Sequence, residues 1–217
     1  MISLKLKAIA FFVEKNDRVV DIGCDHAYLC VYLAQNDLCK SIIASDINVN
    51  ALNNAINNVT KYKLNKKIKC ILSDGLNNVD EKNIDTVVIA GMGTKTIKHI
   101  LNNKEKLKNI NKIILSSNND HYLLRKYMQK NHYKLVDEKI IYEKKHYYVI
   151  SKYEKGKQRL KKSELMFGLY KKENIEYYKY LMNENKLLLK KIPLLKSKER
   201  SKLRKENKYL KKYINTK

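Results

Sequence analysis

The chain of 217 residues lacks tryptophan and has only one proline and six glycines. Its four cysteines, Cys24, Cys30, Cys39 and Cys70, form no CxxC pair and lie in no histidine cluster at zinc spacing. We therefore expect reduced, mostly buried thiols and no metal site. No apolar run approaches the ~20 residues of a membrane span, and the N-terminus lacks the apolar segment of a secretory signal. These absences predict a cytoplasmic protein without a membrane partner.

Acidic residues are also scarce, with 22 Asp and Glu against 46 Lys and Arg and a net charge of +24. Such an excess favours a polyanionic partner, which can be RNA, DNA or an anionic membrane surface. Residues 151–217 carry 22 basic and 7 acidic side chains, so the excess is concentrated in the C-terminal part. An AT-rich coding sequence also enriches Lys and Asn, but it does not place the charge in one segment.

Short β-branched runs alternate with helix-length segments through the first 130 residues, a pattern typical of a parallel sheet covered by helices. The five predicted strands are residues 18–22, 41–45, 67–72, 86–90 and 112–116. The four predicted helices are residues 27–35, 49–62, 95–102 and 122–131. This order predicts an α/β fold with a doubly wound sheet.

Two further strand-like segments, residues 134–142 and 146–153, are separated only by Glu143, Lys144 and Lys145. So short a connection predicts an antiparallel hairpin, because a parallel return needs a long crossover. A Rossmann-like sheet that ends in an antiparallel hairpin is typical of class I methyltransferases, whereas dehydrogenase sheets usually continue in parallel. This comparison is an analogy at the level of the fold, and it predicts a first domain over residues 1–155.

Residues 156–217 are predicted to form a small, basic, α-helical domain. One helix is expected over residues 160–195 with an interruption near Pro193, and a second over residues 196–213. A helical hairpin or short antiparallel coiled coil fits this pattern. A pair of solvated charged helices without a partner is the alternative.

An acid and a glycine follow the first predicted strand, in the segment Asp21-Ile-Gly-Cys-Asp-His-Ala-Tyr-Leu29. Ligands of open α/β sheets bind outside the carboxyl ends of the strands, where glycine allows close approach to the backbone. The dehydrogenase pattern GxGxxG is absent, because Asp25 and His26 stand where further glycine is expected. A pyrophosphate would be repelled by Asp25, so the turn disfavours NAD. It suits S-adenosylmethionine, which has no phosphate and carries an ammonium and a sulfonium.

Three further predicted strands also end in residues suited to a ligand. Asp46, followed by Ile47, is placed to accept hydrogen bonds from ribose hydroxyls. Asp74 and Gly75 are placed to receive the adenine edge of the cofactor. The segment Gly91-Met92-Gly93 leaves backbone open to the cofactor and to the substrate. Ordinary Asp and Gly turn chemistry explains each of these turns separately. Together, ligand-suited turns at four successive strand ends favour a cofactor site.

The sequence resembles the bacterial tRNA (adenine-22-N1)-methyltransferases over nearly the whole chain. The resemblance rests on the segment 21–29, on Ala90-Gly-Met-Gly93, on Leu6-Lys-Ala-Ile-Ala10 and on Phe167-Gly168. It implies a Rossmann methyltransferase domain followed by a coiled-coil domain, S-adenosylmethionine as cofactor and tRNA as partner. The chain departs from the family pattern in three places. The family typically has Gln-Pro-Asn at Ser116-Ser117-Asn118, Arg at Lys5 and a second Gly at Thr94.

The resemblance also implies roles for individual residues. It implies cofactor binding by Asp21, Gly23, Asp46, Asp74, Gly91 and Met92. Four neighbouring residues are also expected at the cofactor: His26, Ile47, Gly75 and Gly93. Asp25 is implied to act catalytically near the target base. We hypothesise that its carboxylate accepts a hydrogen bond from the adenine amino group while Asn118 orients the base.

Three side chains near this predicted site carry open alternatives. Lys5 is expected to contact the substrate. Tyr28 is expected either to stack on a flipped-out base or to belong to the core. His26 either contacts the cofactor or the backbone as a structural residue or takes part in proton transfer.

Two other functions remain open at this stage. One is methylation of another RNA, such as rRNA, or of a protein; the other is a non-catalytic RNA-binding protein on a Rossmann scaffold. The motif of Asn or Asp, two prolines and an aromatic residue, typical of exocyclic amino methylation, is absent after the fourth predicted strand. The sequence gives no sign of an obligate protein partner.

Overall fold

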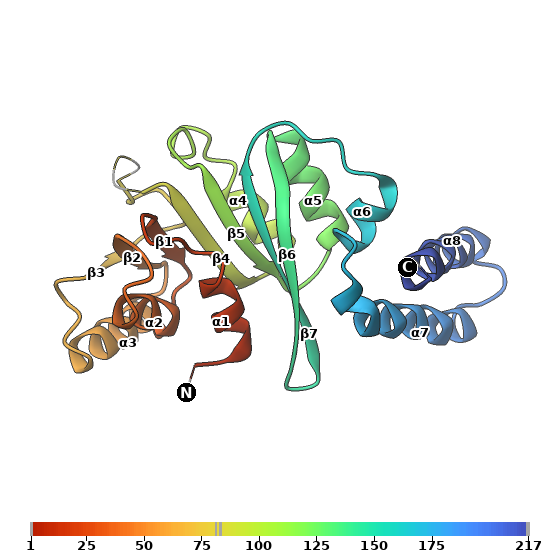
Figure 1. Ribbon diagram of the computed structural model, residues 1–217, viewed down its shortest axis with the longest axis horizontal. Coiled ribbons are helices and arrows are strands. Elements are labelled where there is room, and N and C mark those ends of the chain that lie inside the picture. The colour runs from red at the N-terminus through yellow and green to blue at the C-terminus, as the bar shows by residue number, and fades with distance from the viewer. Residues whose placement is uncertain (1, 81, 83, 216–217) are drawn as a thin grey trace. The chain divides into compact units, whose positions relative to one another are not determined.

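The computed structural model describes residues 2–80, 82 and 84–215, and the chain divides into two units, Met1–Arg159 and Leu160–Lys217. The first unit is built on a seven-stranded sheet with the order β3-β2-β1-β4-β5-β7-β6 (Figure 1). The strands are β1 Arg18–Ile22, β2 Ser41–Asp46, β3 Ile68–Leu72, β4 Thr86–Met92, β5 Lys112–Ser117, β6 Tyr133–Glu143 and β7 His146–Lys155. The predicted Rossmann-like α/β sheet is confirmed.

The strand order places a crevice at the centre of the sheet. Strand β1 pairs in parallel with β2 on one side and with β4 on the other. The strands that follow β1 in the chain, β2 and β3, are therefore added on one side of β1, whereas the strand that follows β4, β5, is added on the far side of β4. At such a switch point the loops that leave the two strands diverge, and ligands bind in the crevice between them.

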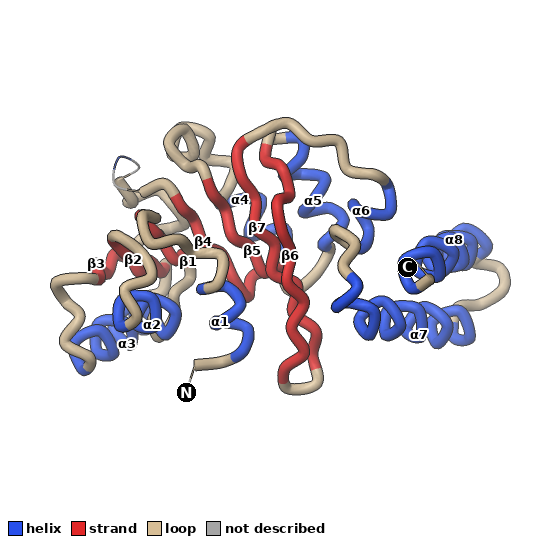
Figure 2. Tube along the Cα trace, viewed as in Figure 1, coloured by secondary structure: helices blue, strands red, loops and turns tan. Residues whose placement is uncertain are grey.

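Helices cover both faces of the sheet (Figure 2). The helices are α1 Leu4–Ala10, α2 Tyr28–Gln35, α3 Val49–Lys61, α4 Thr94–Ile100 and α5 His121–Lys130. Helix α2 connects β1 to β2, and α3 connects β2 to β3, in one half of the sheet. Helix α4 connects β4 to β5, and α5 follows β5, in the other half. Because parallel crossovers are right-handed, the two pairs lie on opposite faces. Helix α1 packs with α2 and α3 around a shared apolar core.

Helix α1 was not among the predicted helices, and its N-terminus shows why. The Ser3 hydroxyl accepts a hydrogen bond from the Leu6 amide at 3.2 Å, which is a local cap. The Glu143 carboxylate of β6 accepts from the Leu4 amide at 2.8 Å and from the Lys5 amide at 3.2 Å. Two of these three capping hydrogen bonds therefore come from a residue far along the chain, which no local pattern shows.

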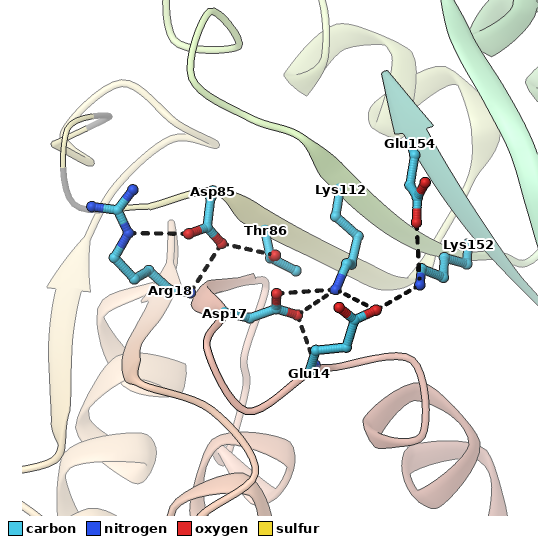
Figure 3. Close-up of polar contacts among 8 residues, drawn as sticks. All are labelled: Glu14, Asp17, Arg18, Asp85, Thr86, Lys112, Lys152 and Glu154. Carbon is cyan, nitrogen blue, oxygen red and sulfur yellow. Dashed lines mark hydrogen bonds and ion pairs between the residues drawn. The ribbon is translucent and has the colours of Figure 1, made fainter. Parts of the chain in front are cut away.

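Ion pairs close the amino edge of the sheet, where β1 and β5 begin (Figure 3). The buried Lys112 ammonium lies 2.7 Å from Asp17 Oδ2 and 3.0 Å from Glu14 Oε1. The Lys152 ammonium of β7 also reaches Glu14 Oε1, at 2.8 Å. The loop before β1 is thus joined to β5 and β7, and the ligand-suited turns lie at the opposite, carboxyl edge.

The second unit, Leu160–Lys217, is helical but is divided differently from the prediction. Its elements are α6 Lys162–Phe167, a short 3-10 helix η2 Lys172–Asn174, α7 Ile175–Lys191 and α8 Ser197–Ile214. The predicted continuous helix over residues 160–195 is wrong, because α6 ends at Gly168, whose φ is +84°. The Gly168 carbonyl accepts a hydrogen bond from the Tyr213 hydroxyl at 3.2 Å. A contact with the far end of α8 thus holds the break.

An aromatic cluster stabilises this helical unit. Its buried members are Phe167, Tyr178, Leu210 and Tyr213. Near Pro193, where the chain turns, the Arg200 guanidinium donates to the Leu189 and Ile192 carbonyls at 2.6 Å each.

Among the described residues of the whole chain, no helix is both long and apolar enough to cross a membrane.

Candidate active site

The turn after β1 is tied to the end of β2. The amides of Gly23 and Cys24 both donate to the Ser45 carbonyl, at 2.8 and 3.0 Å. Gly23 has φ +75°, and a Cβ added to it would lie 2.2 Å from Met92 Cε. The turn therefore needs glycine for its left-handed backbone and for the close approach of the Met92 side chain, which brings the β1 and β4 turns together.

Asp46 orients this turn from the end of β2. Its carboxylate is buried and accepts from the Asp25 amide at 3.1 Å through Oδ2 and from the Asn48 amide at 2.9 Å through Oδ1. Each carboxylate oxygen has a second lone pair, so Asp46 can still accept hydrogen bonds from a ligand. Two backbone donors hold its plane fixed, as a residue that recognises ribose hydroxyls requires.

Asp25 occupies an unusual backbone conformation in the same turn. Its φ is +50°, in the left-handed region that Asp tolerates better than most residues. The Asp46 hydrogen bond stabilises this conformation, and the Asp25 side chain remains 69% exposed at the carboxyl edge. The turn thus presents a solvated carboxylate beside two buried ones.

Asp21, at the end of β1, is the most deeply buried of these acids. Burial raises its pKa to about 7, and the neighbouring Asp46 carboxylate acts in the same direction. The Cys30 thiol, 3.6 Å from Asp21 Oδ2, and the Lys5 ammonium lower the pKa but do not compensate for burial. Burial in turn lowers the pKa of Lys5. A positively charged ligand at this edge would offset the acidic charge, so these residues fit the ammonium and sulfonium of S-adenosylmethionine.

Gly91 is the point where the structure brings Lys5 and Asn118 together. It lies in a bulge of β4 with φ +81°. The Lys5 ammonium lies 3.4 Å from the position that a Cβ on Gly91 would occupy. Asn118 Nδ2 donates to the Gly91 carbonyl at 2.7 Å, and the Asn118 amide donates to the Met92 carbonyl at 2.9 Å. Lys5 and Asn118, far apart in sequence, thus both lie next to the Gly91 bulge.

His26 and Tyr28 stack on each other beside Asp25. Their ring centroids are 5.3 Å apart with an interplanar angle of 22°. Tyr28 is 54% exposed, so the alternative that placed it in the core is wrong. His26 Nε2 lies 3.7 Å from Asp25 Oδ1, and its carbonyl accepts from Asn58 Nδ2 at 2.9 Å. The pair forms an aromatic ledge next to the exposed carboxylate.

The remaining predicted cofactor residues lie at the rim of the site. Ile47 is 65% exposed directly after Asp46. Asp74 and Gly75 follow β3, one strand farther from the switch point, and line a cavity of about 260 Å³ with residues of α4 and the loops beside it. Gly93 precedes α4. These positions are compatible with an adenine edge between the β3 and β4 loops.

Sequence reasoning missed a hydrogen-bonded cluster that joins the loops after β4 and β5. The Thr94 amide donates to Asn119 Oδ1 at 2.9 Å, and the Thr94 and Ser117 hydroxyls are 2.9 Å apart. Thr94 and Ser117 stood out only as departures from the family pattern. Their hydroxyls join the connection between β4 and α4, which follows Gly91, to the loop that carries Asn118. The run of small polar residues after the fifth strand was the signal available in the sequence.

Neither metal ligation nor disulfide chemistry is indicated in the part of the chain that the structure describes. It contains no group of three or more His, Cys, Asp or Glu side chains suited to a metal ion. All four cysteines are free thiols; Cys24 and Cys30 are buried, whereas Cys39 and Cys70 are half-buried. Burial raises the pKa of each thiol, which keeps it protonated.

Comparison with known proteins agrees with this geometry. Residues 2–151 match a family model described as a methyltransferase domain. The tRNA (adenine(22)-N(1))-methyltransferase of Bacillus subtilis is 34% identical over 143 residues, which cover 65% of this chain and 60% of that protein.

Two solved structures match nearly the whole chain. The M. capricolum protein TrmK, in complex with the cofactor product S-adenosyl-homocysteine, is 33% identical with a TM-score of 0.86, and the match covers 99% of this chain and 98% of that one. The Streptococcus pneumoniae protein Sp1610, a candidate tRNA (m1A22) methyltransferase, is 30% identical with a TM-score of 0.92, covering 99% and 100%. The chain therefore belongs to the bacterial tRNA (adenine(22)-N(1))-methyltransferase family.

Proposed function

We propose that this chain transfers a methyl group from S-adenosylmethionine to N1 of adenine 22 in tRNA. The observation that carries the proposal is the turn at Asp25. Its amide is tied to the buried Asp46, while its own carboxylate stays exposed in the turn that follows Asp21 at the switch point. This arrangement provides acids for a cationic cofactor and a separate acid for the substrate.

The cofactor is held, in this proposal, by the acids at successive strand ends. Asp21 lies next to the positive charge of the cofactor, and Asp46 accepts from the ribose hydroxyls. Gly23 and Gly91 let the cofactor approach the backbone at the two sides of the crevice. Asp74 and Gly75 receive the adenine edge.

The reaction itself needs little proton transfer. S-adenosylmethionine supplies an electrophilic methyl group bonded to a positively charged sulfur. Adenine N1 attacks with its in-plane lone pair, the carbon–sulfur bond breaks, and the bonding electron pair stays with sulfur. The positive charge passes to the base, so catalysis consists of alignment and charge stabilisation.

Asp25 and Asn118 are proposed to act on the base. The adenine amino group has two hydrogens, and the Asp25 carboxylate accepts one of them while it stabilises the developing charge. Asn118 Nδ2 is engaged by the Gly91 carbonyl at 2.7 Å, which directs its Oδ1 as the acceptor for orienting the base. Because N1 lies on the Watson–Crick edge, the base must be unpaired or flipped out, and the exposed Tyr28 ring is placed to stack on it.

The helical unit is proposed to bind tRNA phosphates as a short coiled coil of α7 and α8. Helix α8 carries eight basic and two acidic side chains, so its contribution to affinity for tRNA is expected to fall steeply as the salt concentration rises.

Since tRNA is modified in the cytoplasm, we place the protein there, and we expect it to act without a protein partner.

The test is incubation of the purified full-length chain with labelled S-adenosylmethionine and unmodified tRNA, followed by nuclease digestion and mass-spectrometric mapping. We expect 1-methyladenosine at position 22, and no product with a matched tRNA that has guanine there. Methylation at another site or on another RNA would overturn the substrate assignment. Cofactor binding without transfer to any RNA would instead support a non-catalytic binding protein.

A further inference from the structure

The hairpin of β6 and β7 extends past the carboxyl edge of the sheet. Strand β5 pairs with β7 only as far as Leu115 and Ser151, whereas the β6–β7 ladder continues to Glu143 and His146. Strand β5 itself runs two residues past Leu115, to Ser117, so about three of the five further residue pairs, roughly 10 Å of strand at about 3.4 Å per residue, extend past its end. Figure 2 shows the two strands continuing beyond their neighbours to a turn at the edge where α1 lies. The hairpin therefore overhangs the proposed active site.

The tip of the hairpin carries two lysines in an unfavourable conformation. Lys144 and Lys145 form the two-residue turn with φ +50° and +64°. This turn matches the twist of the strands but favours Asn and Gly, because other side chains crowd the left-handed backbone. Both lysines are exposed, as is the adjacent His146. The turn thus places two positive charges at the outermost point of the hairpin.

One face of the hairpin is already occupied by α1. The Glu143 carboxylate caps the amides of Leu4 and Lys5, which uses the acid nearest the tip. The Lys5 ammonium lies 5.2 Å from the centroid of the Tyr148 ring. These contacts hold the hairpin against α1, which lies beside it in Figure 1.

The opposite face carries a pair of tyrosines. Tyr142 and Tyr147 are cross-strand partners, with ring centroids 4.7 Å apart and a 45° interplanar angle. Because side chains alternate along a strand, Tyr142 shares a face with Glu138, whose carboxylate pairs with Arg125 of α5 at 2.8 Å. The tyrosines therefore lie beyond α5, on the side where the Asn118 loop leads from β5 into that helix. Tyr142 is 57% exposed, and the Tyr147 ring packs against it.

We propose that Tyr142, supported by Tyr147, stacks on an unpaired nucleobase next to the target adenine, while Lys144 and Lys145 bind the adjoining phosphates. An exposed aromatic face flanked by cations is the chemistry that recognises single-stranded nucleic acid, because every base offers a face for stacking. The overhang brings this surface to the edge where the target base must enter. The inference rests on the proposed function, since that function makes the nucleic acid a tRNA.

The absence of tryptophan from the chain allows a direct test of stacking. The variant Tyr142→Trp introduces a single indole that can stack in place of the phenol. Addition of unmodified tRNA is expected to quench its fluorescence. The matched control is Tyr62→Trp at the end of α3, which is 44% exposed and outside the hairpin, and we expect little change there. Equal responses of the two variants would overturn the proposal.

Binding measurements provide the second test. Tyr142→Ala is expected to raise the tRNA Kd roughly tenfold, a typical loss for one base stack, with an unchanged cofactor Kd. Tyr142→Phe should bind tRNA as the wild type does, because stacking needs the ring and not the hydroxyl. If Tyr142→Phe weakens tRNA binding as much as Tyr142→Ala does, stacking by the Tyr142 ring is refuted.

The wild-type chain in the same assay separates the two proposals. If it methylates tRNA and Tyr142→Ala binds tRNA equally well, only the hairpin proposal fails. If the wild type neither binds nor methylates tRNA, both proposals fall. Binding of Tyr142→Trp to an unrelated protein but not to RNA would likewise refute the hairpin's assignment to nucleic acid.

Discussion

The replacement Asp21→Asn tests whether a buried acid is kept at an energetic cost for the sake of the cofactor. Asp21 lies at the switch point, and burial, with a contribution from Asp46, raises its pKa from 3.8 to about 7. A tenfold change in an ionisation constant corresponds to about 1.4 kcal/mol. The charged form of Asp21 in the folded, cofactor-free protein is therefore disfavoured by about 4 kcal/mol relative to the unfolded chain.

The pH dependence of this penalty has a definite sign. Between pH 4 and pH 7 the unfolded chain has lost the Asp21 proton that the folded protein still holds, so the free energy of unfolding falls as pH rises. Below pH 4 both states are protonated and the penalty disappears. Asn carries no charge at any pH. Asp21→Asn should therefore be more stable than the wild type at pH 8, by up to about 4 kcal/mol, and similar to it at pH 4.

Urea unfolding of both proteins across this pH range measures the effect, with the exposed Asp37→Asn as control. The Lys67 ammonium lowers the pKa of Asp37, so that variant should gain no stability at high pH. Isothermal titration should show that Asp21→Asn binds S-adenosylmethionine more weakly, and that binding to the wild type near pH 6.5 releases a proton. A variant with no stability gain at pH 8, or with undiminished cofactor affinity, would refute the reasoning.

Three further replacements test other parts of the site and fold. Asp25→Asn should lower the methylation rate far more than the cofactor affinity, as measured by steady-state kinetics and titration; equal activity would contradict its catalytic role. Gly23→Ala should cost about 1–2 kcal/mol in urea unfolding for its positive φ, and it should weaken cofactor binding because the flexible Met92 end must move away. Lys112→Met should destabilise the fold by about 3–5 kcal/mol, because it leaves Asp17 buried without its cation, yet leave the cofactor Kd unchanged, since this ion pair lies at the opposite edge.

Local patterns predicted most of the first unit well. Strands such as β1 and β2 are buried β-branched runs bounded by turn residues, and their predicted limits agree with the structure to within a residue or two. The continuous helix predicted over residues 160–195 failed because Gly168 breaks it, held by the distant Tyr213 hydroxyl. Helix α1 was missed because Glu143 completes its cap. Both errors arise where a residue remote in sequence satisfies backbone polar groups.

The sequence by itself determined the order of strands and helices, the excess of positive charge and the acids and glycines at successive strand ends, since these depend on residue type and spacing. Only the tertiary structure decided how they act together. It removed Asp21 from water, which raises its pKa, and it brought Lys5 and Asn118 next to Gly91. It also carried Tyr142 beyond the edge of the sheet. Burial and proximity depend on long-range packing, and neighbours along the chain cannot supply either.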